Sequence, residues 1–251
     1  MLTIEEADGV RSLHFGTPAV QGAMRIAQPD AIELEYVRQM MMWLLFHGQA
    51  RHIVQLGLGA ASLTKFCHRY LPSARVTAVE LDPEVIRACH EHFALPADDE
   101  RLQVLNMDAM DYVGDFSRRR SADILQVDLY DALAKAPVWG TSAFYAACAN
   151  SLAADGIMTV NLFCDWPDHA LNIQAMRQSF EAVAWLPEVH DGNIVAIAFK
   201  RPPSIDFDTL RARAAHLCKT LGLPAGQWVD GLESWMRGEL DPPGHPAGKK
   251  P

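Results

Sequence analysis

A glycine turn between two apolar strands constrains the fold of this chain more than any other feature. The run Ile53-Val54-Gln55-Leu56 enters Gly57-Leu58-Gly59-Ala60-Ala61-Ser62, a helical segment follows, and a second apolar run ends at Glu80. Glycines at the tip of a buried strand let a ligand approach the backbone, and an acid at the tip of the next strand, about 20 residues on, accepts hydrogen bonds from a ribose. This pattern predicts a site for an adenosine-type cofactor.

From about residue 51 the chain alternates between predicted strands and helices, which indicates a parallel sheet with helices on both faces. Near the end, Asp191-Gly192 stands between two apolar runs, Trp185–Val189 and Ile194–Phe199, which predicts a hairpin. Parallel strands closed by an antiparallel hairpin are typical of Rossmann-like methyltransferases rather than dehydrogenases. We therefore expect an α/β fold with a Rossmann-like class I methyltransferase-type sheet, mostly parallel, with an antiparallel last strand.

The residues before this alternation have a pattern of their own. Residues 1–30 contain short apolar runs with a turn at Asp8-Gly9, which predicts a small N-terminal β-extension. Asp30 could cap a helix from Ala31 to about His47. Within that helix, the apolar run Met40-Met41-Met42-Trp43 belongs either to the core or to the surface of a homodimer.

Composition divides the chain into four expected parts. Beyond Pro202-Pro203 we expect two amphipathic helices, over 207–221 and 225–238, and then a tail rich in Pro, Gly and Lys, which is typical of disorder. The parts are a β-meander over 1–30, a Rossmann-like nucleoside-binding catalytic domain over 31–202, a C-terminal helical extension over 203–240 and a disordered tail over 241–251.

Charge and cysteine content narrow the class of protein. The formal net charge of -9 argues against a nucleic-acid surface and is compatible with a cationic substrate. The 5 cysteines form no C-x-x-C pair, which favours free thiols in a reducing cytoplasm. His90 and His92 point to different faces of their helix, so no metal is expected. The N-terminus lacks a basic start and the longest apolar stretch, Met40 to Phe46, is too short for a bilayer, so we expect a cytoplasmic protein without a membrane partner.

Acids or glycines follow four of the predicted strands, and in an open parallel sheet ligands bind at those carboxyl ends. Because Pro83 favours Asp82 as the cap of the next helix, we assign Glu80 to the ribose and Asp82 to structure. Asp108, after the third strand, either caps its own helix or binds an adenine amino group.

Asp128 ends the fourth strand and begins the segment Asp128-Leu129-Tyr130-Asp131. An acid here would lie beside the reactive end of a bound sulfonium donor. An amine nucleophile arrives protonated, with a pKa near ~10.4 if it is lysine-like, and a carboxylate can take that proton. The alternative is a loop acid that caps the helix after Thr141. We favour the catalytic role, because Tyr130 and Asp131 converge on the same expected cleft.

The segment from Val54 to about Phe163 resembles the spermidine/spermine synthase family, the aminopropyltransferases that use decarboxylated S-adenosylmethionine. The most specific match is the family's D-x-x-D motif with the F-Y segment that follows it. The matching segments are Glu80-Leu81-Asp82-Pro83-Glu84-Val85-Ile86, Asp108-Ala109, Asp128-Leu129-Tyr130-Asp131, Ser142-Ala143-Phe144-Tyr145, Asp155-Gly156 and Cys164-Asp165-Trp166.

The resemblance implies transfer of an aminopropyl group to a polyamine without a metal, with Asp128 as the general base. It also implies three sets of site residues. These are Gln21, Gly57, Gly59, Glu80, Asp108 and Ala109 for the donor; Asp128, Tyr130 and Asp131 for catalysis; and Asp131, Asp165 and Trp166 for the polyamine.

Two positions depart from the family pattern. Ala60 stands where the family's glycine loop carries an aspartate that holds the donor's aminopropyl ammonium, and Arg38 stands where a neutral or weakly basic residue is usual. Losing an acid and gaining a base would suit a carboxylate-bearing donor, intact S-adenosylmethionine; alternatively, Arg38 faces solvent. Two further interpretations therefore stay open: a small-molecule methyltransferase, and a catalytically inactive nucleoside-binding relative.

Overall fold

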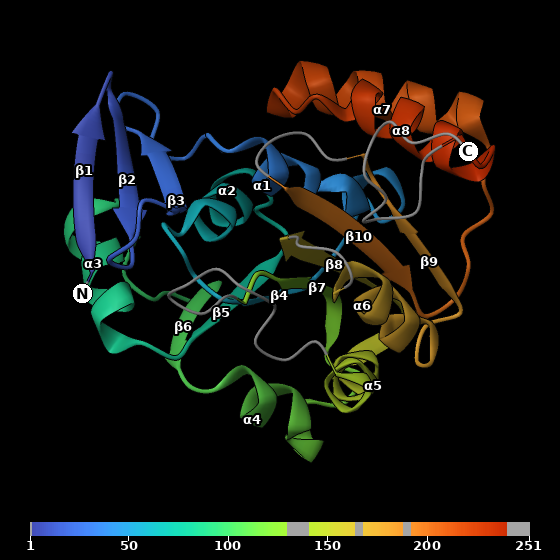
Figure 1. Cartoon of the computed structure of the whole chain (residues 1–251), viewed down its shortest axis with the longest axis horizontal. Helices are drawn as coiled ribbons and strands as arrows, with labels where there is room; N and C mark the ends of the chain where they lie inside the picture. The colour runs from blue at the N-terminus through green and yellow to red at the C-terminus, as the bar shows by residue number, and fades with distance from the viewer. Residues whose placement is uncertain (1, 130–140, 164–167, 188–191, 240–251) are drawn as a thin grey trace.

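A seven-stranded sheet forms the centre of the protein, and helices cover both of its faces (Figure 1). The computed structural model describes residues 2–129, 141–163, 168–187 and 192–239. The strands of the sheet are β4 (His52–Leu56), β5 (Arg75–Glu80), β6 (Leu102–Asn106), β7 (Ala122–Val127), β8 (Leu152–Phe163), β9 (Ala182–Trp185) and β10 (Asn193–Phe199).

The order of the strands is β6-β5-β4-β7-β8-β10-β9, and β10 runs antiparallel to both of its neighbours. The neighbouring pairs from β6 to β8 are parallel. This order confirms the predicted methyltransferase-type sheet. The predicted hairpin is also confirmed, although its first strand occupies Ala182–Trp185 rather than Trp185–Val189.

The helices pack on the sheet in two layers, and we name the faces after α2 and α5 (Figure 1). No helix in the described residues is long and apolar enough to cross a membrane. The α2 face carries α1 (Glu35–Gln39), the 3-10 helix η1 (Met42–Leu45), α2 (Ser62–Tyr70), α3 (Pro83–His92), α7 (Phe207–Leu221) and α8 (Ala225–Met236). The α5 face carries α4 (Ala109–Gly114), α5 (Ser142–Ser151) and α6 (Asp168–Arg177), and the short η2 (Phe116–Arg118) follows α4.

The core is divided between the two faces because successive residues of a strand point to opposite sides. On β4, Ile53 belongs to the hydrophobic cluster of the α2 face and Val54 to the cluster of the α5 face. Residues Met40 to Trp43 are at most 1% exposed and belong to the first cluster. That stretch is therefore core and not the surface of a dimer.

The C-terminal helices α7 and α8 cover η1 on the α2 face (Figure 1). The guanidinium of Arg213 donates to the carbonyl oxygen of Leu45 at 2.7 Å, and Trp228 is buried beside this segment. At Gly231 an added Cβ would lie 2.9 Å from the ring of Pro187, so α8 packs closely on the segment after β9. The two helices thus belong to the same core as the sheet.

The predicted helix from Ala31 to His47 is wrong in its bounds. Asp30 does not cap it; the helical backbone begins after Leu34, without a side-chain cap, and α1 ends at Gln39. The carbonyl oxygen of Met40 accepts hydrogen bonds from side chains of the sheet, and the Leu44 N–H bonds to the carbonyl of Met41 instead. Side chains of the sheet thus compete with the helical hydrogen-bond pattern and divide the segment into α1 and η1.

A separate three-stranded antiparallel sheet lies at one end of the molecule (Figure 1). It comprises β1 (Thr3–Ala7), β2 (Val10–His14) and β3 (Val20–Arg25). The last strand packs on the turn after β4: an added Cβ at Gly22 would lie 2.5 Å from the Ala60 nitrogen, and Ser62 Oγ donates to the carbonyl of Ala23 at 3.0 Å. The small sheet therefore forms one wall beside the glycine turn.

Candidate active site

The turn after β4 is shaped by backbone contacts from β3 and from the end of β7. At Gly57 (φ +91°) an added Cβ would lie 2.1 Å from the carbonyl oxygen of Asp128. At Gly59 (φ +52°) it would lie 2.9 Å from the carbonyl oxygen of Gln21. Residues with a Cβ rarely adopt such angles, and the backbone leaves little room for one. The structure thus brings Gln21, both predicted glycines and Asp128 together at one edge of the sheet.

Glu80, at the end of β5, accepts a backbone hydrogen bond from the glycine turn. One of its carboxylate oxygens accepts the N–H of Leu58 at 3.0 Å and the other accepts the N–H of Asp82 at 2.9 Å. Burial raises the pKa of Glu80, and the backbone hydrogen bonds oppose that rise. Each oxygen keeps a further lone pair, so the carboxylate can still accept a bond from a ligand. Asp82 caps α3 by accepting the Glu84 N–H at 2.8 Å, as predicted.

Asp108 lies two residues after β6 and caps the helix that follows, α4. Its carboxylate accepts the N–H of Met110 at 2.7 Å, which is the structural role that the sequence left open. Ala109 is the first residue of α4 and is buried. Since β6 is separated from β4 by β5, both residues lie farther from the glycine turn than Glu80 does. Their contact with an adenine stays a prediction.

Asp128 follows β7 directly, and its backbone N–H continues the pairing with β4 by donating to the carbonyl of Leu56 at 2.9 Å. Its carboxylate accepts two side-chain hydrogen bonds, from Tyr36 Oη at 3.3 Å and from Asn161 Nδ2 at 2.9 Å. Desolvation raises the pKa of Asp128, and these two bonds partly oppose the rise. Thr141 caps α5, so the alternative in which Asp128 caps that helix is wrong.

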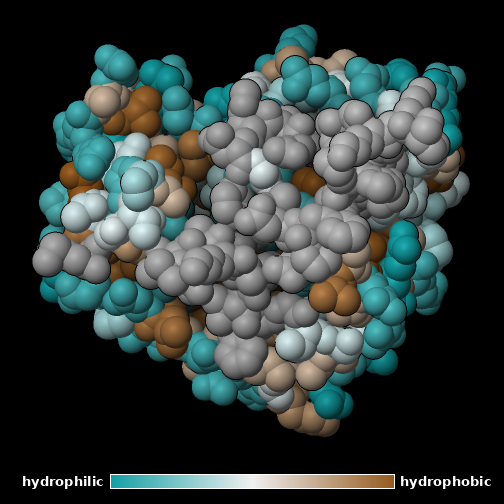
Figure 2. Space-filling model, in the orientation of Figure 1, coloured by the Kyte–Doolittle hydropathy of each residue, from teal (hydrophilic) through white to brown (hydrophobic). Residues whose placement is uncertain are grey.

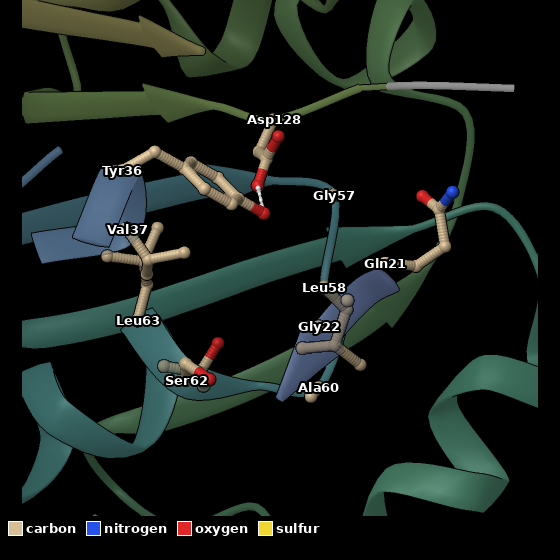
Figure 3. Close-up of a pocket in the computed structure, with 12 residues that line it drawn as sticks. Gln21, Gly22, Tyr36, Val37, Gly57, Leu58, Ala60, Ser62, Leu63 and Asp128 are labelled. Atoms are coloured by element: carbon tan, nitrogen blue, oxygen red, sulfur yellow. Dashed lines mark hydrogen bonds between the residues drawn. The ribbon is translucent and has the colours of Figure 1, made fainter. Parts of the chain in front are cut away.

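A cleft opens between the glycine turn, α1 and the end of β7 (Figure 3). In Figure 3 the Tyr36 ring reaches across the cleft to the Asp128 carboxylate. Among the described residues that line this cleft, Asp128 is the one acid. They are Gln21, Gly22, Tyr36, Val37, Gly57, Leu58, Gly59, Ala60, Ser62, Leu63, Thr64 and Asp128.

The two partners of the Asp128 carboxylate were not predicted from the sequence. Tyr36 lies two residues before Arg38, a position that departs from the family pattern. Asn161 is a polar residue near the carboxyl end of β8, among apolar neighbours such as Val160 and Leu162. A polar side chain at the end of an apolar strand was the signal that could have found Asn161.

Arg38 does not line the cleft. Its guanidinium donates to the carbonyl oxygen of Ile32 at 2.7 Å and to the carboxylate of Glu35 at 3.1 Å, which ties α1 to the segment before it. Its predicted contact with a donor carboxylate therefore has no support in the structure. Four other predicted site residues lie outside the described residues and stay predictions: Tyr130, Asp131, Asp165 and Trp166.

The sheet order and the strand-tip cleft define the class of the protein: a Rossmann-like α/β protein with a methyltransferase-type sheet. Residues 34–208 match the family model described as spermine/spermidine synthase domain, so the chain belongs to that family. A polyamine aminopropyltransferase of Chromobacterium violaceum is 33% identical over 232 residues, which cover 92% of this chain and 88% of that protein.

Two solved structures share the fold. A probable spermidine synthase of Corynebacterium glutamicum superposes with a TM-score of 0.70 at 20% identity, covering 100% of this chain and 95% of that one. The human methyltransferase-like protein 13, in complex with SAH, has a TM-score of 0.67 at 21% identity, covering 76% of this chain and 93% of that one. One architecture thus occurs both in a probable spermidine synthase and in a methyltransferase-like protein.

Proposed function

We propose that the protein transfers an aminopropyl group from decarboxylated S-adenosylmethionine to a polyamine amine, with Asp128 as the general base. The observation that carries this proposal is the carboxylate at the end of β7, which abuts the glycine turn and is held by Tyr36 and Asn161. Membership of the spermine/spermidine synthase family and the likeness to a polyamine aminopropyltransferase support the same activity.

The chemistry that we propose for Asp128 is the removal of one proton. An acceptor ammonium loses a proton to the carboxylate, and its nitrogen lone pair then bonds to the donor carbon next to the sulfonium. The donor supplies that carbon, and methylthioadenosine leaves with the electron pair of the broken C–S bond. A carboxylate whose pKa is raised by desolvation is a stronger proton acceptor than an exposed one. Tyr36 and Asn161 fix its orientation, which raises the rate through positioning.

The donor would be held along the edge of the sheet. The donor would approach the backbone of the glycine turn closely, with its ribose on Glu80 and its adenine on Asp108. Gln21 would reach the donor from β3. The polyamine would be bound by Asp131, Asp165 and Trp166, which agrees with the acidic net charge of the chain.

Methyl transfer from intact S-adenosylmethionine is the second candidate, and Ala60 favours it. Ala60 is 2% exposed and lies against the backbone of β3, where an added Cβ at Gly22 would be 2.7 Å from the Ala60 Cβ. The side chain at position 60 is therefore a buried methyl group packed against β3. The described cleft therefore offers no acid at this position to hold a free aminopropyl ammonium.

Calorimetry with the two donors separates the candidates. Tighter binding of decarboxylated S-adenosylmethionine, with turnover on a polyamine, would support aminopropyl transfer, and tighter binding of the carboxylated donor would support methyl transfer.

The variant Asp128→Asn tests the general base: it should bind the donor but lose at least about a hundredfold in kcat. The matched control Asp111→Asn, at an exposed acid of α4, should keep full activity. Donor binding without turnover on any amine would instead indicate an inactive relative.

A further inference from the structure

A row of buried polar side chains crosses the α2 face of the sheet. Its member on β7, Gln126, lies two residues before Asp128. Gln55, Gln126 and Thr159 are cross-strand partners on β4, β7 and β8. Each of them is at most 1% exposed. Burying a polar group is costly unless the group is hydrogen-bonded, so a polar row within an apolar core requires partners for its members.

The hydrogen bonds of this row run in one direction, from α2 to α1. Thr64 Oγ1 donates to Gln55 Oε1 at 2.6 Å, and Gln55 Nε2 donates to Gln126 Oε1 at 3.0 Å. Gln126 Nε2 then donates to the carbonyl oxygen of Met40 at 3.0 Å, where Thr159 Oγ1 adds a second bond at 3.1 Å. Thr64 of α2 lines the cleft, and Met40 is the C-cap of α1, whose residue Tyr36 also lines it, so the row links two elements that border the cleft.

The register between α1 and β7 connects this row to the Asp128 carboxylate. Tyr36 and Met40 are four residues apart in a helical segment, so they lie on one side of it, about 6 Å apart along its axis. Gln126 and Asp128 are two residues apart along the strand direction, about 6.6 Å, and point to the same face. The two spacings match. When Gln126 holds Met40, Tyr36 lies over Asp128, as the 3.3 Å Tyr36 Oη–Asp128 Oδ2 distance shows.

We propose that Gln126 is a positioning residue for the reaction, because its bond to the Met40 carbonyl sets the place of Tyr36 against the Asp128 carboxylate. This inference rests on the proposed function of Asp128. Gln126 does not line the cleft, so it acts through α1. In the described part of the chain, the polar groups that act on the Asp128 carboxyl are Tyr36 from α1 and Asn161 from β8. A displaced Tyr36 must therefore change the pH dependence of the base.

The first test is Gln126→Met, which keeps the side-chain volume and removes the bonds of the Gln126 amide to Gln55, to the Met40 carbonyl and to Met41 Sδ at 3.5 Å. We expect kcat to fall by roughly ten- to a hundredfold, because misplacing a catalytic group is costly, while donor affinity changes little. The acid limb of the kcat–pH profile should move to higher pH, because the Asp128 carboxylate loses a bond that favours its charged form. An unchanged pH profile would overturn the inference. Thr159→Val, which removes the second bond to Met40, should act in the same direction with a smaller effect and serves if Gln126→Met folds poorly.

A double-mutant cycle with Tyr36→Phe separates positioning from a general loss of stability. If Gln126 acts through Tyr36, then Tyr36→Phe lowers kcat much less in the Gln126→Met background than in the wild type. Additive losses in kcat would overturn the inference. The matched control is Thr77→Val: Thr77 is buried on β5 on the α5 face, bonded to His52 at 3.0 Å, and its loss should lower stability without moving the pH profile.

The same cycle can be measured without turnover, by urea unfolding of the wild type, the two single variants and the double variant. If Gln126 and Tyr36 act on each other through α1, the loss of unfolding free energy in the double variant should differ from the sum of the two single losses. Additive unfolding free energies would overturn the inference for Gln126 alone. Absence of turnover in the wild type with every donor and amine would overturn the proposed function alone.

Discussion

Gly57 and Asp128 are in backbone contact: a Cβ added at Gly57 would lie 2.1 Å from the carbonyl oxygen of Asp128. The pairing of β4 with β7 continues to this point through the bond from the Asp128 N–H to the Leu56 carbonyl. The proposed donor turn and the proposed base therefore belong to one backbone unit, and a displacement of the turn also displaces the carboxylate.

Gly57→Ala should damage both parts of this unit. The new methyl group meets backbone atoms, and the φ of +91° is unfavourable for alanine, so we expect a loss of about 2 kcal/mol or more in the free energy of unfolding. Donor affinity should fall at least about tenfold. Urea unfolding and calorimetry measure the two effects. Gly226→Ala, in α8 with no atom within 4 Å of the added Cβ, is the control and should stay within about 1 kcal/mol. Equal losses in both variants would contradict the contact.

Asn161→Ala should weaken the base in a pH-dependent way. The Asn161 amide donates to Asp128 Oδ1 at 2.9 Å and so favours the charged carboxylate. Without that bond, the already raised pKa of Asp128 rises further. The proposed base acts when ionised, so activity should be lost as pH falls through this pKa, and the loss should begin at higher pH in the variant. A kcat–pH profile measures the shift. Asn150→Ala, at an exposed position of α5, should leave the profile unchanged.

Lys65→Met should reveal the cost of a buried amine in α2. Lys65 is 1% exposed, its Nζ donates to the carbonyl of Phe93 at 2.6 Å, and burial lowers its pKa to about 8. Between that pKa and the ordinary value of 10.5 the unfolded chain holds a proton that the folded protein has released. Wild-type stability relative to the variant should therefore rise across this window as pH rises, by up to about 3 kcal/mol.

The measurement for Lys65 is urea unfolding of both proteins at a series of pH values from 7 to about 10.5. Lys219→Met, at an exposed residue of α7, should show no such trend relative to the wild type. A pH-independent difference between the wild type and Lys65→Met would contradict the buried state of this amine.

The sequence predicts those parts of the fold that depend on neighbouring residues. The glycines of the turn, Asp82 as a helix cap and the hairpin around Gly192 all follow from local backbone chemistry. The break after α1 could not be predicted in this way, because the Met40 carbonyl takes its partners from residues 86 and 119 positions away. An apolar period of 3.6 residues continues through such a break without any sign of it.

The candidate site likewise contains one residue that its neighbours in the sequence predict and two that depend on distant residues. Asp128 was predicted because it ends an apolar run, and its strand brings it to the cleft. Its two partners were missed because they lie 92 and 33 positions away and become neighbours when α1 packs beside β7 and when β8 pairs with β7. An acid can be found from its strand, whereas the groups that tune it depend on the packing of other elements.

The cover that α7 and α8 give to η1 limits how far the protein can be shortened. A version that stops after β10 would retain all the residues that line the cleft. It would nevertheless expose to solvent Trp43 and the apolar side chains around it, which are buried in the intact chain. An exposed hydrophobic area of this kind promotes aggregation, so we do not expect the fragment that ends after β10 to be a soluble, independently folded protein.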